Sequence, residues 1–308
     1  MAAGIITQNT APRMLLPSAI STIYGTEYEI AAKKAIHTKL YEMKTSDRAY
    51  EEALQLVGIG PASLKDEGGT IEMDSYQQGY DRLSYHQVWA KKMRITEEAF
   101  EDNKHISQAQ TMGKMLAQSS LLAKEINGHA LFNNPTSTSA PFVGADGVAF
   151  LSTAHVLSKG GTLANKPSVD ADLSEAAIEA ACQGIWNWTD DANNRIFLKP
   201  KALFLHQNQV FDAHRILKSS LRVATADNDA NALMDMGMIP EIIPSVYLTD
   251  TDAWFILVDG PGLVMYSRYA TEQFSYNDDQ TRDLVFGIKD RYVFDYYDPR
   301  AVFGSVGA

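Results

Sequence analysis

The stretch from Thr281 to Ser305 constrains the fold most, because apolar and charged residues alternate in it. The apolar residues of one parity are Leu284, Phe286, Ile288, Tyr292, Phe294 and Tyr296. The charged residues of the other parity are Asp283, Lys289, Arg291 and Asp295. A period of two indicates a strand with one buried face, and Asp298-Pro299 ends it because proline cannot donate to a sheet. We therefore expect a C-terminal strand whose apolar face lies in a core and whose charged face meets solvent or another subunit.

Length and composition favour a globular chain with two compact regions. A chain of 308 residues exceeds the roughly 250–300 residues at which a single core stops growing. A hydrophobic content of 45% is enough for ordinary cores and argues against global disorder. No apolar run approaches the ~20 residues of a membrane span, and the N-terminus lacks the pattern of a signal peptide. We expect no membrane association.

Charge and cysteine content narrow the function classes further. The net charge of −11 argues against a basic surface that would grip nucleic acid through its phosphates. Cys182 is the only cysteine, so no internal disulfide and no cysteine-based zinc site can form. It lies in an apolar helical stretch, which predicts a buried structural thiol and suits a reducing cytoplasm.

The order of the segments predicts an α+β chain without a regular βαβ rhythm. Residues 1–20 are interpreted as an arm, and a helix is expected over 26–43. The polar, tyrosine-rich segment 45–96 alternates like two strands around a Gly-rich tip, which predicts a β-ribbon. Residues 97–132 have helical spacing with a possible break near Asp102-Asn103, and 135–262 mix short helices and strands. A lone ribbon is marginally stable in water, so its apolar face needs a cover, which is a neighbouring subunit if no local surface serves.

No motif for catalysis, a cofactor or a metal is complete. Gly58-Ile59-Gly60 is only a fragment of a dinucleotide loop, because the third glycine and the following helix are missing. His206 and His214 could hold a metal, but scattered structural histidines are the better interpretation. Ser152 and His155 could form a hydroxyl–imidazole pair, yet no oxyanion loop accompanies them. We predict no catalytic, metal-binding or cofactor-binding residue.

Three motifs and the order of the segments resemble the major capsid proteins of tailed bacteriophages, with the Mu-like major head subunit branch the nearest in appearance. The motifs are Leu131-Phe132-Asn133-Asn134, Phe150-Leu151-Ser152-Thr153-Ala154-His155 and the closing Asp298-Pro299-Arg300-Ala301-Val302-Phe303-Gly304. The resemblance covers nearly the whole chain, and the order of the segments carries most of its weight.

This resemblance implies a division of the chain into an arm and helix (1–44), an extended loop (45–96), a peripheral domain with a spine helix (97–134), an axial domain (135–262) and a return to the peripheral domain (263–308). The extended loop would contact the adjacent subunit through Lys65, Asp66, Glu67, Tyr85, Trp89 and Arg94. The core of the peripheral domain would contain Met112, Leu116, Leu284, Phe286, Ile288 and Phe294. The candidates for intersubunit charge contacts are Lys289, Arg291 and Arg300.

The function that the resemblance implies is structural and not enzymatic. The subunit would self-assemble as hexamers and pentamers into an icosahedral shell that encloses double-stranded DNA without sequence-specific binding. It would be located in the virion, be assembled in the cytoplasm of a bacterial host, and work with scaffolding, portal and decoration proteins. Because the sequence starts almost directly at the arm, we expect either a separate scaffolding protein or a mature chain. An encapsulin-like nanocompartment shell of the same fold is the alternative, and a cytoplasmic hydrolase ranks behind both.

Overall fold

The computed structural model describes residues 10–75, 77–102, 105–221 and 230–308, and their helices and strands form two compact units. Unit 1 comprises Met1–Ala49, Tyr85–Gly128 and Met265–Phe294, and unit 2 comprises Tyr50–Ser84, His129–Val264 and Asp295–Ala308. The predicted α+β class is confirmed, because both units combine helices with antiparallel or mixed sheets. Among the described residues, no helix is both long and apolar enough to cross a membrane.

Unit 1 is built on a four-stranded sheet with the order β1-β10-β11-β4. Its strands are β1 (Glu42–Thr45), β4 (Gln87–Ile95), β10 (Leu263–Asn277) and β11 (Leu284–Tyr296). The predicted C-terminal strand is β11, which pairs antiparallel with β4 from Leu284 opposite Ile95 to Tyr292 opposite Gln87. The short 3-10 helix η2 (Pro299–Ala301) follows it, and the Asp298 side chain caps that turn.

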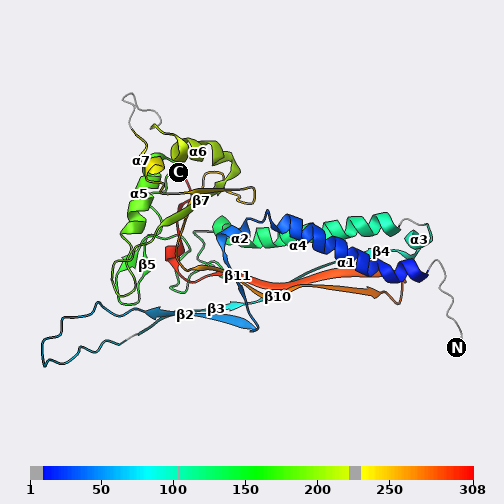
Figure 1. The fold of residues 1–308 in the computed structure, drawn as a ribbon, viewed down its shortest axis with the longest axis horizontal. Coiled ribbons are helices and arrows are strands. Elements are labelled where there is room, and N and C mark those ends of the chain that lie inside the picture. Colours follow the sequence, from blue (N-terminus) through cyan, green and yellow to red (C-terminus); the bar gives the residue numbers. More distant parts are fainter. Residues whose placement is uncertain (1–9, 76, 103–104, 222–229) are drawn as a thin grey trace. The chain divides into compact units, whose positions relative to one another are not determined.

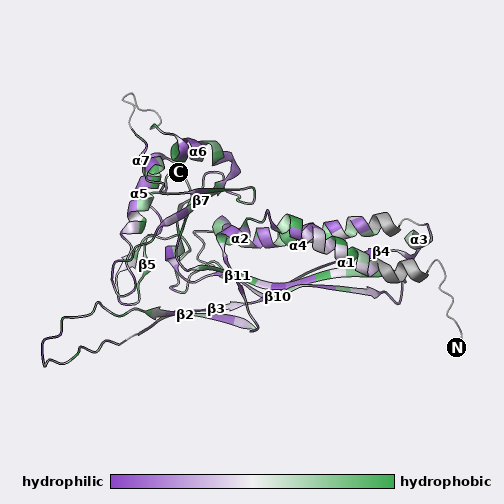
Figure 2. Cartoon of the chain, viewed as in Figure 1, coloured by the Kyte–Doolittle hydropathy of each residue, from purple (hydrophilic) through white to green (hydrophobic). Residues whose placement is uncertain are grey.

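Helices α1 (Thr10–Ala32) and α4 (His105–Asn133) run alongside each other against this sheet (Figure 1). The short helices α2 (His37–Leu40) and α3 (Glu97–Glu101) complete unit 1. Its buried cluster combines residues of α1, α3, α4, β4 and β11: Ile20, Tyr24, Ile95, Ala99, Ala109, Met112, Leu116, Ala117, Leu284, Phe286 and Ile288. The apolar parity of β11 thus packs on the long helix, while Figure 2 shows hydrophilic residues interspersed along both elements.

The helical elements differ from the sequence-based expectation at two places. Residues 10–20 were predicted as an arm, but they are the first half of α1, which contains Pro17. A proline inside a helix costs about 3 kcal/mol, and the complete burial of Ile20 and near-complete burial of Tyr24 against α4 offset that cost. Residues 1–9 of the predicted arm lie outside the described residues. The helix expected over 97–132 is two helices, α3 and α4, and Asn103 of the predicted break also lies outside the described residues.

The predicted ribbon is shorter than residues 45–96. It consists of β2 (Tyr50–Val57) and β3 (Gln77–Tyr85), which pair only with each other. The prediction that 87–95 belongs to the ribbon is wrong, because β4 is an edge strand of the unit 1 sheet. Alternation continues through both strands, so the pattern of apolar residues alone does not reveal that the chain changes partner near His86.

Unit 2 contains a second four-stranded sheet with the order β12-β9-β7-β8. Its strands are β7 (Pro200–His206), β8 (Glu241–Ser245), β9 (Trp254–Val258) and β12 (Val302–Ser305), with β7 parallel to β8 and the other pairs antiparallel. The remaining elements are β5 (His155–Val156), β6 (Thr162–Leu163), α5 (Glu175–Trp186), η1 (Gln207–Gln209), α6 (Val210–Lys218) and α7 (Ala232–Asp235). Because β12 pairs with β9, residues 295–308 belong to unit 2 and not, as expected, with the long helix.

Two of the recognised motifs have a structural explanation in unit 2. The Phe132 ring makes edge-to-face contacts with Phe150, Phe204 and Phe255, at centroid distances of 5.6, 4.9 and 5.1 Å. The Asn133 amide donates to the carbonyl of Tyr247 at 3.0 Å and accepts from the backbone N–H of Thr249 at 3.0 Å. These residues fix the end of α4 in the core of unit 2.

Candidate assembly sites

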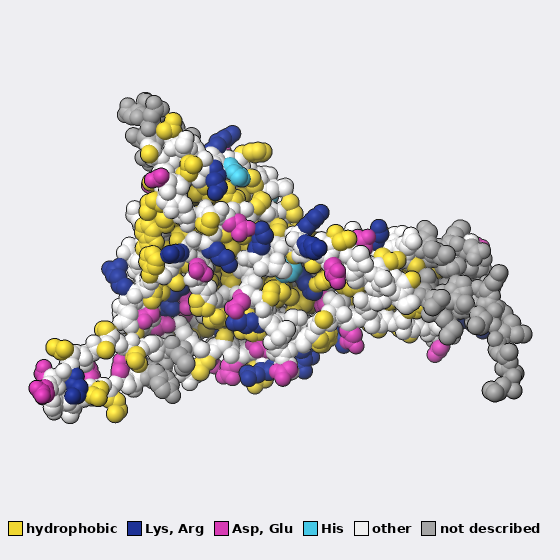
Figure 3. Space-filling model, viewed as in Figure 1, with side chains coloured by type: hydrophobic (Ala, Val, Ile, Leu, Met, Phe, Trp, Pro, Cys, Tyr) yellow, Lys and Arg dark blue, Asp and Glu magenta, His cyan; other side chains and the backbone are white. Residues whose placement is uncertain are grey.

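The chain between β2 and β3 forms a loop, residues 58–76, whose hydrophobic side chains lack a local core. Leu64 is 94% exposed, Ile71 79% and Met73 95%. The predicted tip residues Lys65, Asp66 and Glu67 are also exposed. Figure 3 shows hydrophobic side chains beside acidic ones along this loop. Hydrophobic side chains this exposed are typical of a surface that another molecule covers.

The ribbon is anchored in unit 2 by Arg82 on β3. Its Nε donates to Asp295 Oδ1 at 2.5 Å, and its two terminal nitrogens donate to the carbonyls of Val143 and Pro141. The guanidinium also lies 4.7 Å from the centre of the Tyr296 ring. Asp295 was predicted to face solvent or another subunit, and this is wrong: it is buried. Burial raises the pKa of its carboxyl, and Arg82 and Ser84 act in the opposite direction.

Arg300 was predicted as an intersubunit contact, but its charge is used within the chain. The side chain is buried, with one terminal nitrogen 2.8 Å from Asp191 Oδ1 and the other 3.0 Å from Asp298 Oδ2. Burial raises the pKa of the Asp298 carboxyl, while Arg300 lowers it. A buried and doubly paired guanidinium is not available to a neighbour, so the prediction for Arg300 is corrected.

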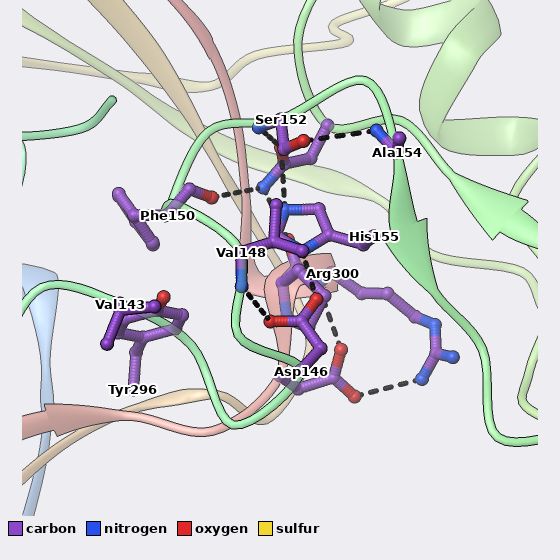
Figure 4. Close-up of polar contacts among 12 residues, drawn as sticks. Val143, Asp146, Val148, Phe150, Ser152, Ala154, His155, Tyr296 and Arg300 are labelled. Carbon is purple, nitrogen blue, oxygen red and sulfur yellow. Dashed lines mark hydrogen bonds and ion pairs between the residues drawn. The ribbon is translucent and has the colours of Figure 1, made fainter. Parts of the chain in front are cut away.

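His155 belongs to a buried polar cluster next to the Arg300 site (Figure 4). Its Nδ1 lies 2.6 Å from Asp146 Oδ2, and its Nε2 lies 3.3 Å from Asn165 Oδ1. The Asn165 amide donates to the carbonyls of Phe150 and Pro299. Ser152 Oγ accepts from the backbone N–H of Ala154. Both imidazole nitrogens are therefore engaged by Asp146 and Asn165, and the cluster joins three loops of unit 2.

Unit 1 contains a buried carboxylate that the sequence reasoning missed. Asp290 lies on the apolar parity of β11 and accepts from the hydroxyls of Ser120 and Thr271, both at 2.6 Å. The Lys124 ammonium lies 3.5 Å from Asp290 Oδ1 and donates to the Tyr28 hydroxyl at 2.7 Å. The only available signal was a charged residue at an otherwise apolar position of the strand.

The other predicted residues occupy different surroundings in unit 1. Lys289 is half exposed and lies 3.7 Å from Glu272, and the partly buried Arg291 has its Nε without a hydrogen-bond partner among the described residues. Asp283, which was expected at the surface, is buried and lies 3.5 Å from the exposed Arg94. The remaining placements are Tyr85 exposed at the end of β3, Trp89 stacked on Tyr292, and Phe294 against His37 and Tyr41.

The described residues contain no arrangement that would hold a metal. No three His, Cys, Asp or Glu side chains gather in residues 10–75, 77–102, 105–221 and 230–308. The His206 imidazole instead accepts from the backbone N–H of Asn208 at 3.2 Å and caps η1. Cys182 is buried in α5, and burial raises the pKa of its thiol to about 11. A thiol with such a pKa is not a nucleophile at neutral pH.

Comparison with known proteins agrees with this picture of a structural subunit. The model of the family described as "phage capsid protein" matches residues 84–305, which is most of the chain. The chain therefore belongs to the phage capsid protein family. It is a major capsid protein, a subunit of the phage head. No curated protein matches its sequence.

Solved structures that are similar to the chain share its fold at low sequence identity. The capsid of a native GTA particle is 11% identical with a TM-score of 0.55, and the match covers 89% of this chain and 91% of that one. The capsid of cyanophage P-SCSP1u is 10% identical with a TM-score of 0.54, covering 87% and 86%. The structure from Microbacterium phage Oxtober96 is 10% identical with a TM-score of 0.54, covering 89% and 91%. The fold of the described chain is that of phage capsid subunits.

Proposed function

We propose that this subunit assembles as hexamers and pentamers into an icosahedral shell around double-stranded DNA, and that it performs no catalysis. Scaffolding, portal and decoration proteins would be its partners, and the shell would form in the cytoplasm of a bacterial host before serving as the virion capsid. The motifs at Leu131–Asn134 and Phe150–His155 favour the Mu-like branch of the family. Family membership and the shared fold support self-association.

In this proposal unit 1 corresponds mainly to the peripheral domain and unit 2 mainly to the axial domain. The loop at 58–76 lies over the adjacent subunit. Three side chains support this assignment, because Leu64, Ile71 and Met73 are almost fully exposed in the isolated chain. Covering a large apolar side chain contributes about 1.5–3 kcal/mol, so these residues supply a driving force for assembly that folding leaves unused.

The negative charge of the subunit fits a container for DNA. At a net charge of −11, a shell would not bind the phosphates of its genome through a general electrostatic attraction. The genome could then pack and leave without breaking many ion pairs. A strongly basic inner face in an assembled shell would contradict this proposal.

Deletion of residues 60–69 tests the role of the loop. The deletion should leave the circular dichroism spectrum and unfolding midpoint of the subunit unchanged, because the loop supports no core, and it should prevent shell formation. A full-length variant with Leu64, Ile71 and Met73 replaced by serine should also assemble poorly, whereas replacing the polar loop residues Ser63 and Thr70 by alanine should not matter. Electron microscopy and sedimentation measure the outcome. Normal shells from both the deletion and the triple variant would refute the proposed role of the loop.

A further inference from the structure

The loop at 58–76 leaves the ribbon at a point where several polar side chains of unit 2 bind its backbone. The Asn194 amide donates to the carbonyl of Ile59 at 3.2 Å, and the Lys159 ammonium donates to the carbonyl of Gly58 at 3.3 Å. One strand residue earlier, the Gln55 amide of β2 donates to Asp191 Oδ2. Three groups from two different loops of unit 2 therefore bind three residues at the start of the extended loop.

The turn at 190–194 is rigid enough to act as a support. Asp190 accepts from the backbone N–H of Ala192 and of Asn194, at 2.8 and 2.7 Å, and from the Asn194 side chain at 2.9 Å. Burial alone would raise the pKa of the Asp190 carboxyl, but the hydrogen bonds from Asn194 and Ala192 lower it overall. Asn193 adopts a left-handed backbone conformation with φ of 62°, which asparagine tolerates better than most residues.

The support is tied to the core of unit 2. Asp191, which binds Gln55, also forms the buried ion pair with Arg300, and Arg300 in turn binds Asp298. The chain Gln55–Asp191–Arg300–Asp298 links the base of the ribbon to the segment before β12. A buried pair of this kind has little freedom to rearrange.

The returning strand of the ribbon is held closely as well. A Cβ atom at Gly79 of β3 would lie 2.9 Å from Ser158 Oγ and 3.2 Å from the carbonyl oxygen of Gln55. Only a residue without a side chain allows β3 to approach the turn between β5 and β6 this closely. Both strands are thus in contact with the same part of unit 2, beyond their own pairing.

We infer that residues 158–159 and 190–194 form a clasp that fixes the direction in which the extended loop leaves unit 2. Asn194 and Lys159 are positioning residues: they contact the loop base and place the exposed Leu64, Ile71 and Met73 for contact with the adjacent subunit. A two-stranded ribbon alone is a weak support for a long loop, so the direction depends on unit 2. The part of this inference that concerns assembly rests on the proposed function of the loop.

The clasp is tested in the unassembled subunit by a distance measurement between two spin labels in unit 2. One label is attached at Leu64→Cys in the loop and the other at Phe211→Cys on α6, since both side chains are exposed and the native Cys182 is buried. The clasp variant is Lys159→Ala with Asn194→Ala. The control is Lys166→Ala with Arg195→Ala, because Lys166 pairs with Asp170 and Arg195 donates to Asn187.

Loss of the two loop-base hydrogen bonds should raise the population of the unclasped loop by about tenfold or more. The distance distribution of the clasp variant should therefore broaden, while that of the control should match the parent. Lys159→Arg, which keeps a donor, should restore part of the narrow distribution when it replaces Lys159→Ala. Equal distributions for the clasp variant and the parent would overturn the inference.

Assembly of the unlabelled variants separates the clasp from the proposed function. We expect the clasp variant to form several-fold fewer shells than the control at equal subunit concentration. If the distribution broadens and assembly is unchanged, the clasp exists but the loop does not serve assembly. If the distribution is unchanged and assembly is lost, the clasp is refuted, and the intersubunit role of the loop can still be judged from the deletion of residues 60–69.

Discussion

Replacing Asp290 by alanine should destabilise unit 1 strongly, because it removes the centre of a buried polar cluster. Asp290 and Lys124 have side chains that are only 6% and 10% exposed, and their charged atoms are 3.5 Å apart. With an effective dielectric constant of about 20, the attraction at the 3.5 Å separation is about 5 kcal/mol before the cost of desolvation. Alanine would leave the Ser120 and Thr271 hydroxyls and the ammonium without their carboxylate. Removing one partner of a buried pair costs about 3–5 kcal/mol.

The reciprocal substitution, Lys124→Met, should cost less, about 1–3 kcal/mol. The carboxylate keeps its two hydrogen bonds from Ser120 and Thr271, and the methionine occupies a similar volume. Lys114→Met is the matched control on the same helix, because the Lys114 pair with Glu27 at 3.1 Å is largely exposed. A surface pair of this kind contributes about 0–1 kcal/mol.

The assay is native-state hydrogen exchange of the unassembled subunit, read in peptides from α4 and β11, with urea unfolding as a second measurement. In a double-mutant cycle with Lys124→Met and Asp290→Ala, the two losses should overlap by about 1–3 kcal/mol, as for residues in contact. The reasoning is refuted if Asp290→Ala costs no more than Lys114→Met, or if the coupling falls below about 0.5 kcal/mol.

The remaining predictions concern single groups in unit 2. Because burial raises the pKa of Asp298 above its ordinary value of 3.8, the folded chain binds this proton more tightly than the unfolded chain. Its stabilising contribution is complete below pH 3.8 and is lost as the pH rises through the folded-state pKa. The free energy of unfolding of Asp298→Asn, from urea titrations across this range, should therefore gain on that of the parent as the pH rises, and a gain in the opposite direction would contradict the burial argument. The thiol of Cys182, with a pKa of about 11, should stay unreactive toward a maleimide at pH 8 in the folded subunit and react only after unfolding.

Local features of the sequence determined the kinds of elements and their buried faces. The alternation over 284–296 predicted β11, and its apolar members Leu284, Phe286 and Ile288 do pack with Met112 and Leu116 of α4. Glycines and the charged tip at 65–69 located the loop of the ribbon. These conclusions depend only on side-chain period and turn chemistry, which are properties of short segments.

The tertiary structure decided which elements pair and which charges remain available. Alternation in β4 is the same whether it pairs with β2 or with β11, because hydrogen bonds of the backbone carry no label of the partner. Arg300 looked available in the sequence, yet its partner Asp191 lies more than a hundred residues away. Arg82 gave no signal for the same reason, since Asp295 is brought beside it only by the fold.

The strand that first indicated a tied C-terminus shows both sides of this division. Its apolar parity was sufficient to predict a core, because burying large apolar side chains is favourable wherever a partner surface exists. Its charged residues did not all face outward, because Asp283 and Asp295 found partners in Arg94 and Arg82. A buried charge is tolerated only beside a partner, and such partners are supplied by contacts distant in sequence, which only the tertiary structure contains.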